Sequence, residues 1–352
     1  MAVLLDYLTH GVQAGASDLF FVPGAPVSMK QEGQLKRMEE DKLMPVRGEE
    51  LIREIYSIAR RDMEGFQECG DDDFSFSVSG LARFRVNTYR QRGSCAAVIR
   101  IVSFDIPDWQ QLHILPQVMD LAGETDGMVL VTGTAGCGKS TTLACLIDRI
   151  NRERACHIIT LEDPIEFLHR NQQSIVSQRE IAVDTADYLS ALRSCLRQAP
   201  DVIQLGEMRD LETIRTAMTA AETGHLLFAT LHTKGAVNTI DRIIDAFPAD
   251  QQEQIRIQLS AVLRTVVSQQ LLPDVNGGMV PAFEIMHVTG AVRSLIRDSK
   301  THQLPGTIAA GGADGMKSMD QSIFELYQAG KITRETALDY ADNYDQMLRR
   351  IG

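Results

Sequence analysis

The sequence of 352 residues contains no apolar run long enough to cross a membrane. Its longest runs, 128–131 and 225–231, fall far short of the ~20 residues that a membrane-spanning helix needs. The first ten residues place Asp6 inside their only apolar stretch and lack the basic leader of a secretion signal. We therefore expect the protein to stay in the cytoplasm.

The sequence also lacks paired cysteines and an excess of positive charge. Its six cysteines are scattered without a CxxC spacing, which argues against a zinc knuckle or a disulfide framework. The net charge of -12 disfavours a protein that binds a phosphate backbone, because such binding needs clustered Lys and Arg. We expect reduced thiols and no nucleic-acid partner.

The remaining composition, 44% apolar and 23% charged, is that of an ordinary globular protein. A chain of this length exceeds what one hydrophobic core usually serves, so two domains are expected. Residues 1–103 are predicted to form a small α+β domain. Its predicted helices are 3–12 and 49–60, and its predicted strands are 18–22, 27–30, 73–78, 82–90 and 96–102.

A linker is predicted at 104–114, because the pattern breaks at Pro107 and Pro116 opens the next helix. In residues 115–352, apolar strand-like runs first alternate with helical stretches, which predicts a mostly parallel sheet flanked by helices. Beyond Pro248 the pattern predicts helices, apart from a strand or hairpin at 279–286. The earlier predicted strands are 128–132, 157–161, 202–205 and 226–230, and the helices between them are 141–150, 186–196 and 211–221.

The strongest motif is GTAGCGKS at 133–140, which matches GxxxxGK[ST] between an apolar strand and a helix. Its glycines let backbone N–H groups curl around phosphate oxygens, and the following helix adds the positive end of its dipole. Lys139 is expected to reach the β- and γ-phosphates, and Ser140 a magnesium ion. The predicted nucleotide-binding residues are Gly133, Thr134, Ala135, Gly136, Cys137, Gly138, Lys139, Ser140 and Thr141.

Cys137 lies inside this loop, between two of its glycines. A redox switch is one reading of it. We expect instead that its side chain points away from the phosphates and that only its backbone binds, since nothing in the sequence indicates a lowered pKa of the thiol.

A second acidic site is needed, because a P-loop alone binds nucleotide without activating water. The apolar strand at 202–205 leads to Glu207, which we expect beside the magnesium. Gly206 stands where many P-loop enzymes carry a metal-binding Asp, so Glu207 is expected to act through a magnesium-bound water. The catalytic base is then a separate residue.

The strand at 157–161 is followed by three carboxylates, Glu162, Asp163 and Glu166. A carboxylate at the C-terminal end of a parallel strand faces the ligand crevice, so all three are candidates for the base. A solvated acidic loop is the alternative. At the end of the strand 226–230, His232 is well placed to touch the γ-phosphate and report hydrolysis.

Four ordered segments resemble the Walker A, Asp, Walker B and His boxes of secretion ATPases. They are GTAGCGKST, IITLEDPIEF, LRQAPDVIQLGEMRDLETI and TGHLLFATLHTKGAVNTIDRIID. Within that family the chain most resembles the PilT-type retraction ATPases of type IV pili, from its first helix through its tail. Its segment AVRSLIRD at 291–298 is similar to the AIRNLIRE motif of that branch.

The resemblance implies an α/β protein with a smaller N-terminal PAS-like domain and a RecA-like P-loop ATPase domain. It implies a homohexamer with nucleotide between subunits, which hydrolyses ATP with Mg2+ to retract pili in twitching motility. The implied partner is an inner-membrane pilus platform protein, which would bring the motor to the inner face of the cytoplasmic membrane. Carried onto this sequence, the resemblance makes Glu166 the catalytic carboxylate, with Glu162 as second choice, Glu207 the Walker B acid and His232 the sensor.

The same resemblance draws attention to two further segments. Arg83, Arg85 and Arg100 lie on strands where the family supplies charge across the interface to the phosphates, although a solvated strand face explains them equally well. The segment 291–298 is predicted to be a helix with Ala291, Val292, Leu295 and Ile296 on one face, and is by resemblance a coupling element. Gln204 departs from the pattern, because it puts a polar side chain inside an expected buried strand.

Three other functions remain open at this point. An assembly or secretion ATPase of the same superfamily usually carries a longer N-terminal region and a four-cysteine zinc insertion, and this sequence has neither. A RecA-like nucleic-acid translocase is disfavoured by the acidic balance and by the lack of a basic aromatic groove. A retraction paralogue that depends on a partner motor shares the same motifs.

Overall fold

The computed structural model describes residues 2–31, 33–102 and 106–352. It divides into two compact units, Met1–Asp105 with Ile165–Leu168, and Ile106–Pro164 with His169–Gly352. Residues 104 and 105 of the predicted linker lie outside the described residues, and residues 106–114 form no helix or strand. Among the described residues, no helix is both long enough and apolar enough to span a membrane.

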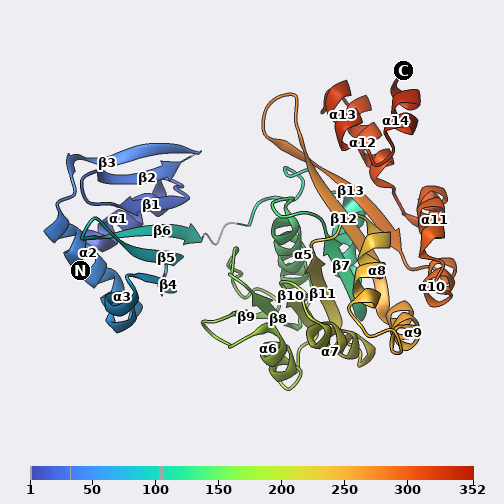
Figure 1. Cartoon of the computed structure of the whole chain (residues 1–352), viewed down its shortest axis with the longest axis horizontal. Coiled ribbons are helices and arrows are strands. Elements are labelled where there is room, and N and C mark those ends of the chain that lie inside the picture. The colour runs from blue at the N-terminus through green and yellow to red at the C-terminus, as the bar shows by residue number, and fades with distance from the viewer. Residues whose placement is uncertain (1, 32, 103–105) are drawn as a thin grey trace. The chain divides into compact units, whose positions relative to one another are not determined.

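The first unit is an antiparallel sheet with the strand order β3-β2-β1-β6-β5-β4 (Figure 1). Three helices accompany it, and α1 and α2 share one core with the sheet. The strands are β1 Asp18–Phe21, β2 Pro26–Gln31, β3 Gln34–Lys42, β4 Asp71–Val78, β5 Ala82–Gln91 and β6 Ser94–Val102. The helices are α1 Ala2–Gln13, α2 Pro45–Ala59 and α3 Glu64–Cys69.

The core of this unit follows from two periodicities. Leu51, Ile52 and Ile55 recur at helical spacing in α2 and are buried, and Phe84 and Val86 alternate along β5 and are buried with them. Side chains between the buried positions of β5 therefore point to the opposite face of the sheet. The sequence patterns predicted most of these elements but missed the short helix α3 and the strand β3, a largely exposed and highly charged edge strand.

The second unit is built on a sheet with the order β13-β12-β7-β11-β10-β8-β9. All neighbours are parallel except β12 and β13. The strands are β7 Gly127–Thr132, β8 His157–Glu162, β9 Ile175–Glu180, β10 Val202–Leu205, β11 Leu226–Leu231, β12 Leu263–Pro273 and β13 Met279–His287. The helices are α4 Pro116–Met119, α5 Lys139–Glu153, α6 Tyr188–Cys195, α7 Leu211–Glu222, α8 Ala236–Asp245, α9 Gln252–Val262, α10 Gly290–Arg297, α11 Leu304–Ala310, α12 Met319–Gln328, α13 Arg334–Tyr340 and α14 Tyr344–Ile351, with short 3-10 turns at Asp120–Gly123, Thr301–Gln303 and Gly311–Asp314.

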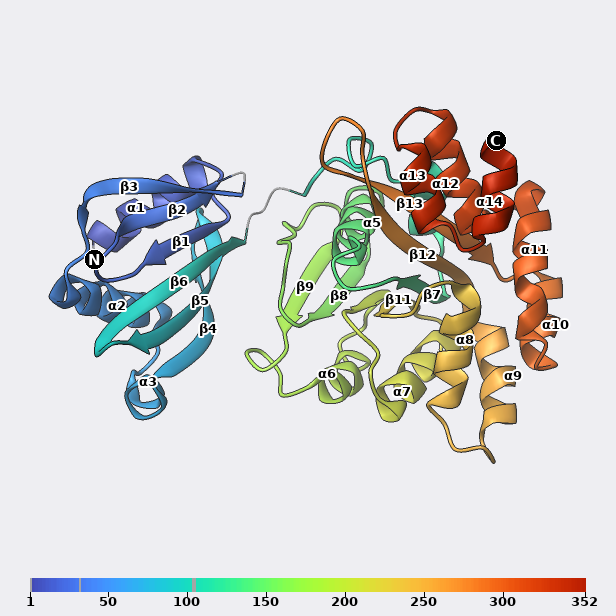
Figure 2. The same ribbon diagram turned by 45° about the horizontal axis from the view of Figure 1, so that its top comes forward.

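Helices cover both faces of this sheet, and its central strands β7 and β11 are correspondingly buried along their whole length. Val129 and Val131 of β7 pack with α5, whereas Met128 and Leu130 of the same strand pack in the core that contains α6, α7 and α8. Figure 2 shows α6, α7, α8 and α9 following one another beside the sheet. The helices α12, α13 and α14 share a third core with β12 and β13.

The prediction of helices beyond Pro248 was wrong at β12. The chain leaves α9 at Val262 and continues directly as the strand Leu263–Pro273. Its apolar residues fit a helical spacing as well as a strand, so the pattern alone cannot choose between them. Pairing with β7 on one side and β13 on the other decides the strand.

The helix predicted at 291–298 is α10, but its predicted apolar face needs a correction. Val292 and Ile296 are buried and Leu295 is partly buried, whereas Ala291 is exposed. Ala291 immediately precedes the buried Val292 in the first turn of α10. Because successive residues of a helix point in different directions around its axis, the small side chain of Ala291 faces away from the core.

Candidate active site

The loop GTAGCGKS connects the buried strand β7 to α5, as the motif predicts. Gly133 and Gly138 have positive φ of 141° and 88°. A Cβ on Gly133 would lie 2.3 Å from the Gln269 carbonyl oxygen and 2.6 Å from Cys137 Sγ. Only glycine fits this conformation and this space, so the tight turn depends on both features.

Lys139 is the first residue of α5, and only 8% of it is exposed. Its Nζ donates to the carbonyl oxygens of Gly133 and Thr134, at 2.8 and 3.0 Å, and lies 3.5 Å from His232 Nδ1. The ammonium group is therefore held over the loop beside the free N–H groups of the first turn of α5, which is the arrangement that binds an anion. Thr134, Ala135 and Gly136 are exposed at the tip of the loop, and Ser140 and Thr141 are partly exposed.

The Cys137 thiol is buried, with 4% of the residue exposed, and this burial raises its pKa. A raised pKa leaves less thiolate near neutral pH than an ordinary cysteine has, and the thiolate is the reactive form. The side chain points inward against Gly133, as expected from the sequence.

We predict that Cys137 resists alkylation in the folded protein. Brief treatment with N-ethylmaleimide at pH 7 should modify the exposed Cys69 well before Cys137, as measured by peptide mass spectrometry. Cys137→Ala should keep its nucleotide affinity, because the loop uses the backbone of this residue. Rapid labelling of Cys137 at neutral pH would instead support a redox switch.

Glu207 lies just beyond β10, with 16% of its side chain exposed. Its Oε1 is 3.3 Å from His232 Nε2, and its Oε2 accepts from Arg209 Nε at 2.7 Å. The residue before Glu207 is also held in place, because the Gly206 carbonyl oxygen accepts a hydrogen bond from the Thr230 hydroxyl of β11. Glu207, His232 and Lys139 thus form one connected group at the mouth of the P-loop.

Packing explains why a glycine precedes Glu207. A Cβ on Gly206 would lie 2.7 Å from the Tyr188 hydroxyl and 3.0 Å from the Leu161 carbonyl oxygen. An aspartate would therefore fit here only if the Tyr188 side chain and the backbone of β8 moved. The acid at the end of β10 is Glu207.

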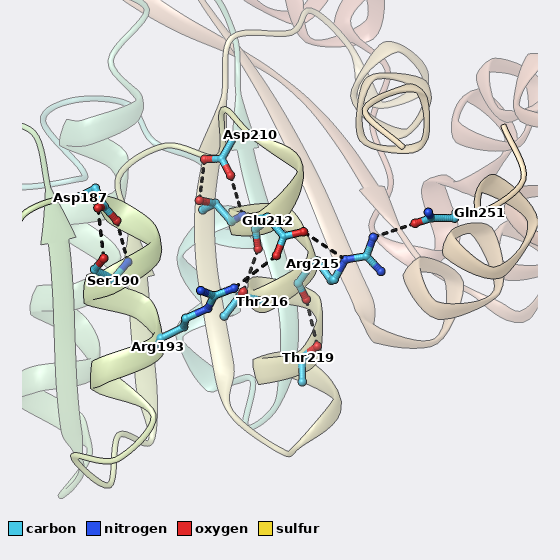
Figure 3. A network of polar contacts seen from close by, with 10 residues as sticks. Asp187, Ser190, Arg193, Asp210, Glu212, Arg215, Thr216, Thr219 and Gln251 are labelled. Atoms are coloured by element: carbon cyan, nitrogen blue, oxygen red, sulfur yellow. Dashed lines mark hydrogen bonds and ion pairs between the residues drawn. The ribbon is translucent and has the colours of Figure 1, made fainter. Parts of the chain in front are cut away.

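The helix after Glu207 begins at a well-made cap. Asp210 accepts from the Thr213 N–H at 2.9 Å, and this fixes the start of α7 three residues after the acid. Figure 3 shows this cap in a polar network on α6 and α7. Arg193 of α6 pairs with Glu212 at 3.3 Å, and Arg215 reaches Gln251 at 2.7 Å.

The carboxylates at and after the end of β8 have different surroundings. Glu162 is buried, and its Oε1 accepts from the Thr160 hydroxyl at 2.6 Å and from Gln178 Nε2 at 3.2 Å. Gln178 Oε1 in turn accepts from the His169 N–H at 2.8 Å, which secures the far end of the acidic loop. Glu166, within that loop, is exposed.

Two glutamines at this site were missed by the sequence analysis. Gln269 of β12 accepts from the Thr142 hydroxyl at 2.8 Å and packs against the P-loop glycines, and Gln178 of β9 bridges Glu162 to the acidic loop. The signal was a polar side chain within a strand, but neither β9 nor β12 was predicted as a strand. Gln204 of β10 was noticed, and it is 6% exposed with no hydrogen-bond partner for its Oε1 within the described part of the chain.

The three candidate arginines lie in the first unit, on one face of its sheet. Arg85 and Arg100 are directly opposite each other in the β5–β6 register, and Arg83 is two residues from Arg85. Arg100 is exposed and its Nε is 3.0 Å from Asp18 Oδ1. Their action across a subunit interface stays a prediction.

Magnesium needs few protein ligands in a site of this kind. No group of three or more His, Cys, Asp or Glu residues that could hold a metal ion is found among the described residues. A nucleotide-bound Mg2+ takes only one or two protein ligands and completes its shell with phosphate oxygens and water. The hydroxyl of Ser140 and the carboxylate of Glu207 have the right chemistry for that role.

Comparison with known proteins identifies the family. The profile "Type II/IV secretion system protein" matches residues 2–311. The chain belongs to this family. It is 42% identical over 339 residues to the type IV pilus retractation ATPase PilT of Pseudomonas aeruginosa, covering 96% of this chain and 98% of that one. It is also 42% identical over 340 residues to a twitching motility protein of Neisseria gonorrhoeae, covering 96% of this chain and 90% of that one.

A solved structure extends the similarity to the fold. The crystal structure titled as the pilus retraction motor PilT with bound ADP superposes with a TM-score of 0.89, at 42% identity and over 99% of both chains. The predicted α/β fold, a RecA-like P-loop ATPase domain with a smaller N-terminal α+β domain, is confirmed. The predicted membership of the secretion ATPases is confirmed with it.

Proposed function

We propose that this protein is an ATP-hydrolysing motor that powers the retraction of type IV pili. The observation that carries the proposal is the connected group of Lys139, His232 and Glu207 at the P-loop. In this group the Lys139 ammonium lies between the carbonyl oxygens of the P-loop and the His232 ring, and the ring in turn contacts the Glu207 carboxylate. The close relatives named for pilus retraction and twitching motility support the direction of the motor.

The side chains have separate roles in the proposed reaction. Backbone N–H groups of the P-loop bind the phosphates, and Lys139 neutralises charge on the β- and γ-phosphates. Glu166 accepts the proton of the attacking water, and His232 responds to loss of the γ-phosphate. Bound Mg2+, held through Ser140 and Glu207, supplies positive charge that offsets the charge developing on the phosphoryl oxygens.

The link between Lys139 and His232 explains how the site could report its own state. Nζ of Lys139 has the carbonyl oxygens of the P-loop and His232 as its partners. A γ-phosphate offers the same ammonium group an anionic partner, and a hydrogen bond between two opposite charges is stronger than one to a neutral carbonyl oxygen. Binding and hydrolysis would therefore change the contact between Lys139 and His232, and with it the contact between His232 and Glu207.

The proposal includes assembly and location. The motor works as a homohexamer with ATP and Mg2+ between subunits, and Arg83, Arg85 and Arg100 supply charge to a neighbouring subunit's phosphates. It is cytoplasmic and meets the inner face of the cytoplasmic membrane only through a pilus platform protein. It binds no nucleic acid, in keeping with its net charge of -12.

We expect the purified full-length chain to hydrolyse ATP in the presence of Mg2+ and to stop when the metal is chelated. Phosphate release measured together with mass by light scattering should give activity in a hexamer. Single-stranded or double-stranded DNA should leave the rate unchanged. A rate that depends on DNA would support a translocase, and a chain that hydrolyses ATP only with a second motor protein would support the partner-dependent paralogue.

A further inference from the structure

The residues that follow His232 are held by hydroxyl groups from two other elements. The Thr233 hydroxyl lies 2.7 Å from the Thr239 hydroxyl of α8, and the Thr239 hydroxyl donates to the Gly235 carbonyl oxygen at 2.7 Å. The Gly235 N–H donates to the Ser268 hydroxyl of β12 at 2.9 Å. Two of the three residues after His232 are therefore fixed by hydrogen bonds to side chains.

The same hydroxyl groups reach the strand that leads into the P-loop. The Thr239 hydroxyl lies 3.5 Å from the hydroxyl of Thr132, the last residue of β7. Thr132 directly precedes Gly133 and is opposite Ser268 in the β7–β12 register. Thr132 and Thr239 are fully buried, and Ser268 is 1% exposed. The loop after His232 and the base of the P-loop thus share one hydroxyl cluster, which consists of Thr132, Thr233, Thr239 and Ser268.

The proton count of Thr239 orders the contacts in the hydroxyl cluster. A hydroxyl has one proton to donate, and the Gly235 oxygen at 2.7 Å is a nearer acceptor than the Thr132 hydroxyl at 3.5 Å. The Thr239 oxygen therefore accepts from the Thr233 hydroxyl. Because a buried polar group needs a partner, this arrangement selects one conformation of the loop.

The position of the His232 ring depends on the chain on either side of it. Its contacts with Lys139 Nζ at 3.5 Å and with Glu207 Oε1 at 3.3 Å are long for hydrogen bonds and orient the ring only weakly. On one side, β11 is paired with β7 up to Leu231. On the other side, the hydroxyl cluster holds the chain.

We propose that Thr239 is a positioning residue for His232 in ATP hydrolysis. Its hydroxyl has its hydrogen-bond partners in the loop and in β7, so it acts through the position of the ring and not on the nucleotide. Without this hydroxyl the loop opens more often, and the ring is less often in place beside Lys139. The inference rests on the proposed ATPase function.

Chemical modification of His232 tests the positioning without any turnover. Thr239→Val keeps the shape of the side chain and removes its hydroxyl, whereas Thr239→Ser keeps the hydroxyl. In the full-length protein, diethyl pyrocarbonate should modify His232 roughly fivefold faster in Thr239→Val than in the wild type, because the loss of one hydrogen bond favours local opening. Thr239→Ser should behave like the wild type. Peptide mass spectrometry measures the rates, and the exposed His302 serves as the internal standard.

Steady-state kinetics test the consequence for the reaction. Thr239→Val should lower kcat roughly tenfold, the effect of about one hydrogen bond, and leave the affinity for fluorescent ADP unchanged. Thr239→Ser should restore kcat. In a His232→Ala background, Thr239→Val should have no further effect on kcat, because residues that act through one another are not additive.

Thr265→Val is the matched control. Thr265 of β12 is also fully buried, and its hydroxyl lies 3.0 Å from His287 Nδ1. The substitution is the same and removes one hydroxyl contact outside the hydroxyl cluster, so it reproduces a loss of stability alone. The modification rate of His232 and kcat should stay near those of the wild type. If Thr239→Val does not fold, Thr233→Val removes the same hydrogen bond from its partly exposed end.

The modification experiment separates this inference from the proposed function. If His232 is modified equally fast in the wild type and Thr239→Val, or if Thr265→Val has the same effect, the positioning role is wrong even when ATP is hydrolysed. Additive losses of kcat in the double variant with His232→Ala would also overturn it. If the wild type shows no hydrolysis but His232 responds to Thr239→Val and not to Thr265→Val, the positioning stands and the motor function fails.

Discussion

Lys139→Ala is expected to abolish ATP hydrolysis, with kcat reduced by ~10²–10³-fold or more. Nζ is the cation closest to the P-loop backbone, since it donates to the carbonyl oxygens of Gly133 and Thr134. Without it, charge on the β- and γ-phosphates has no lysine partner in the loop. Steady-state phosphate release and the affinity for fluorescent ADP would measure the two parts of the loss.

Arg152→Ala provides the control for this change. Arg152 lies on the same helix, with 61% of its side chain exposed, and pairs with Asp148 at 2.8 Å. Removing one positive charge there should leave both the rate and the affinity near those of the wild type, since exposed ion pairs contribute little. Equal activity of Lys139→Ala and Arg152→Ala would show that the P-loop is not the hydrolytic site.

Sequence reasoning succeeded where chemistry is encoded locally. The P-loop needs glycines at fixed positions between a buried strand and a helix, and the motif, the strand and the helix are contiguous in the chain. The sequence singles out Glu207 and His232 for the same reason, because each follows the end of a parallel strand and such ends meet at one edge of a sheet.

Reasoning from sequence failed where tertiary pairing decides the structure. β12 follows α9 without a break, and its residues become a strand only because β7 and β13 lie on either side. Gln269, which packs against the P-loop, was missed with it.

The structure also distinguishes residues that the sequence treated alike. Glu162, the last residue of β8, and Glu166, in the loop after it, belong to a single acidic segment, and a motif assigns them by position only. Glu162 is buried with hydrogen bonds from Thr160 and Gln178, whereas Glu166 is exposed. A buried, multiply bonded carboxylate is suited to holding a loop, and an exposed one is better suited to meeting a water molecule.

Glu166→Gln is therefore expected to lower kcat by ~10²–10⁴-fold while nucleotide binding and the melting temperature stay close to those of the wild type. The amide keeps the size of the side chain but cannot accept a proton. Single-turnover hydrolysis, ADP affinity and thermal unfolding would be measured on the same preparation. This variant removes the proposed base and nothing else.

The companion variant Glu162→Gln should behave differently. Both hydrogen bonds end on Oε1, and the amide oxygen can still accept them, but it carries no negative charge. The bonds from Thr160 and Gln178 therefore weaken, and the protein loses ~1–3 kcal/mol of stability. The acidic loop would then be less well ordered and kcat would fall, but less than in Glu166→Gln. If Glu162→Gln abolishes turnover at an unchanged melting temperature while Glu166→Gln remains active, the base is Glu162. A loss of turnover without a loss of stability would mean that Glu162 accepts the proton and does not merely hold the loop.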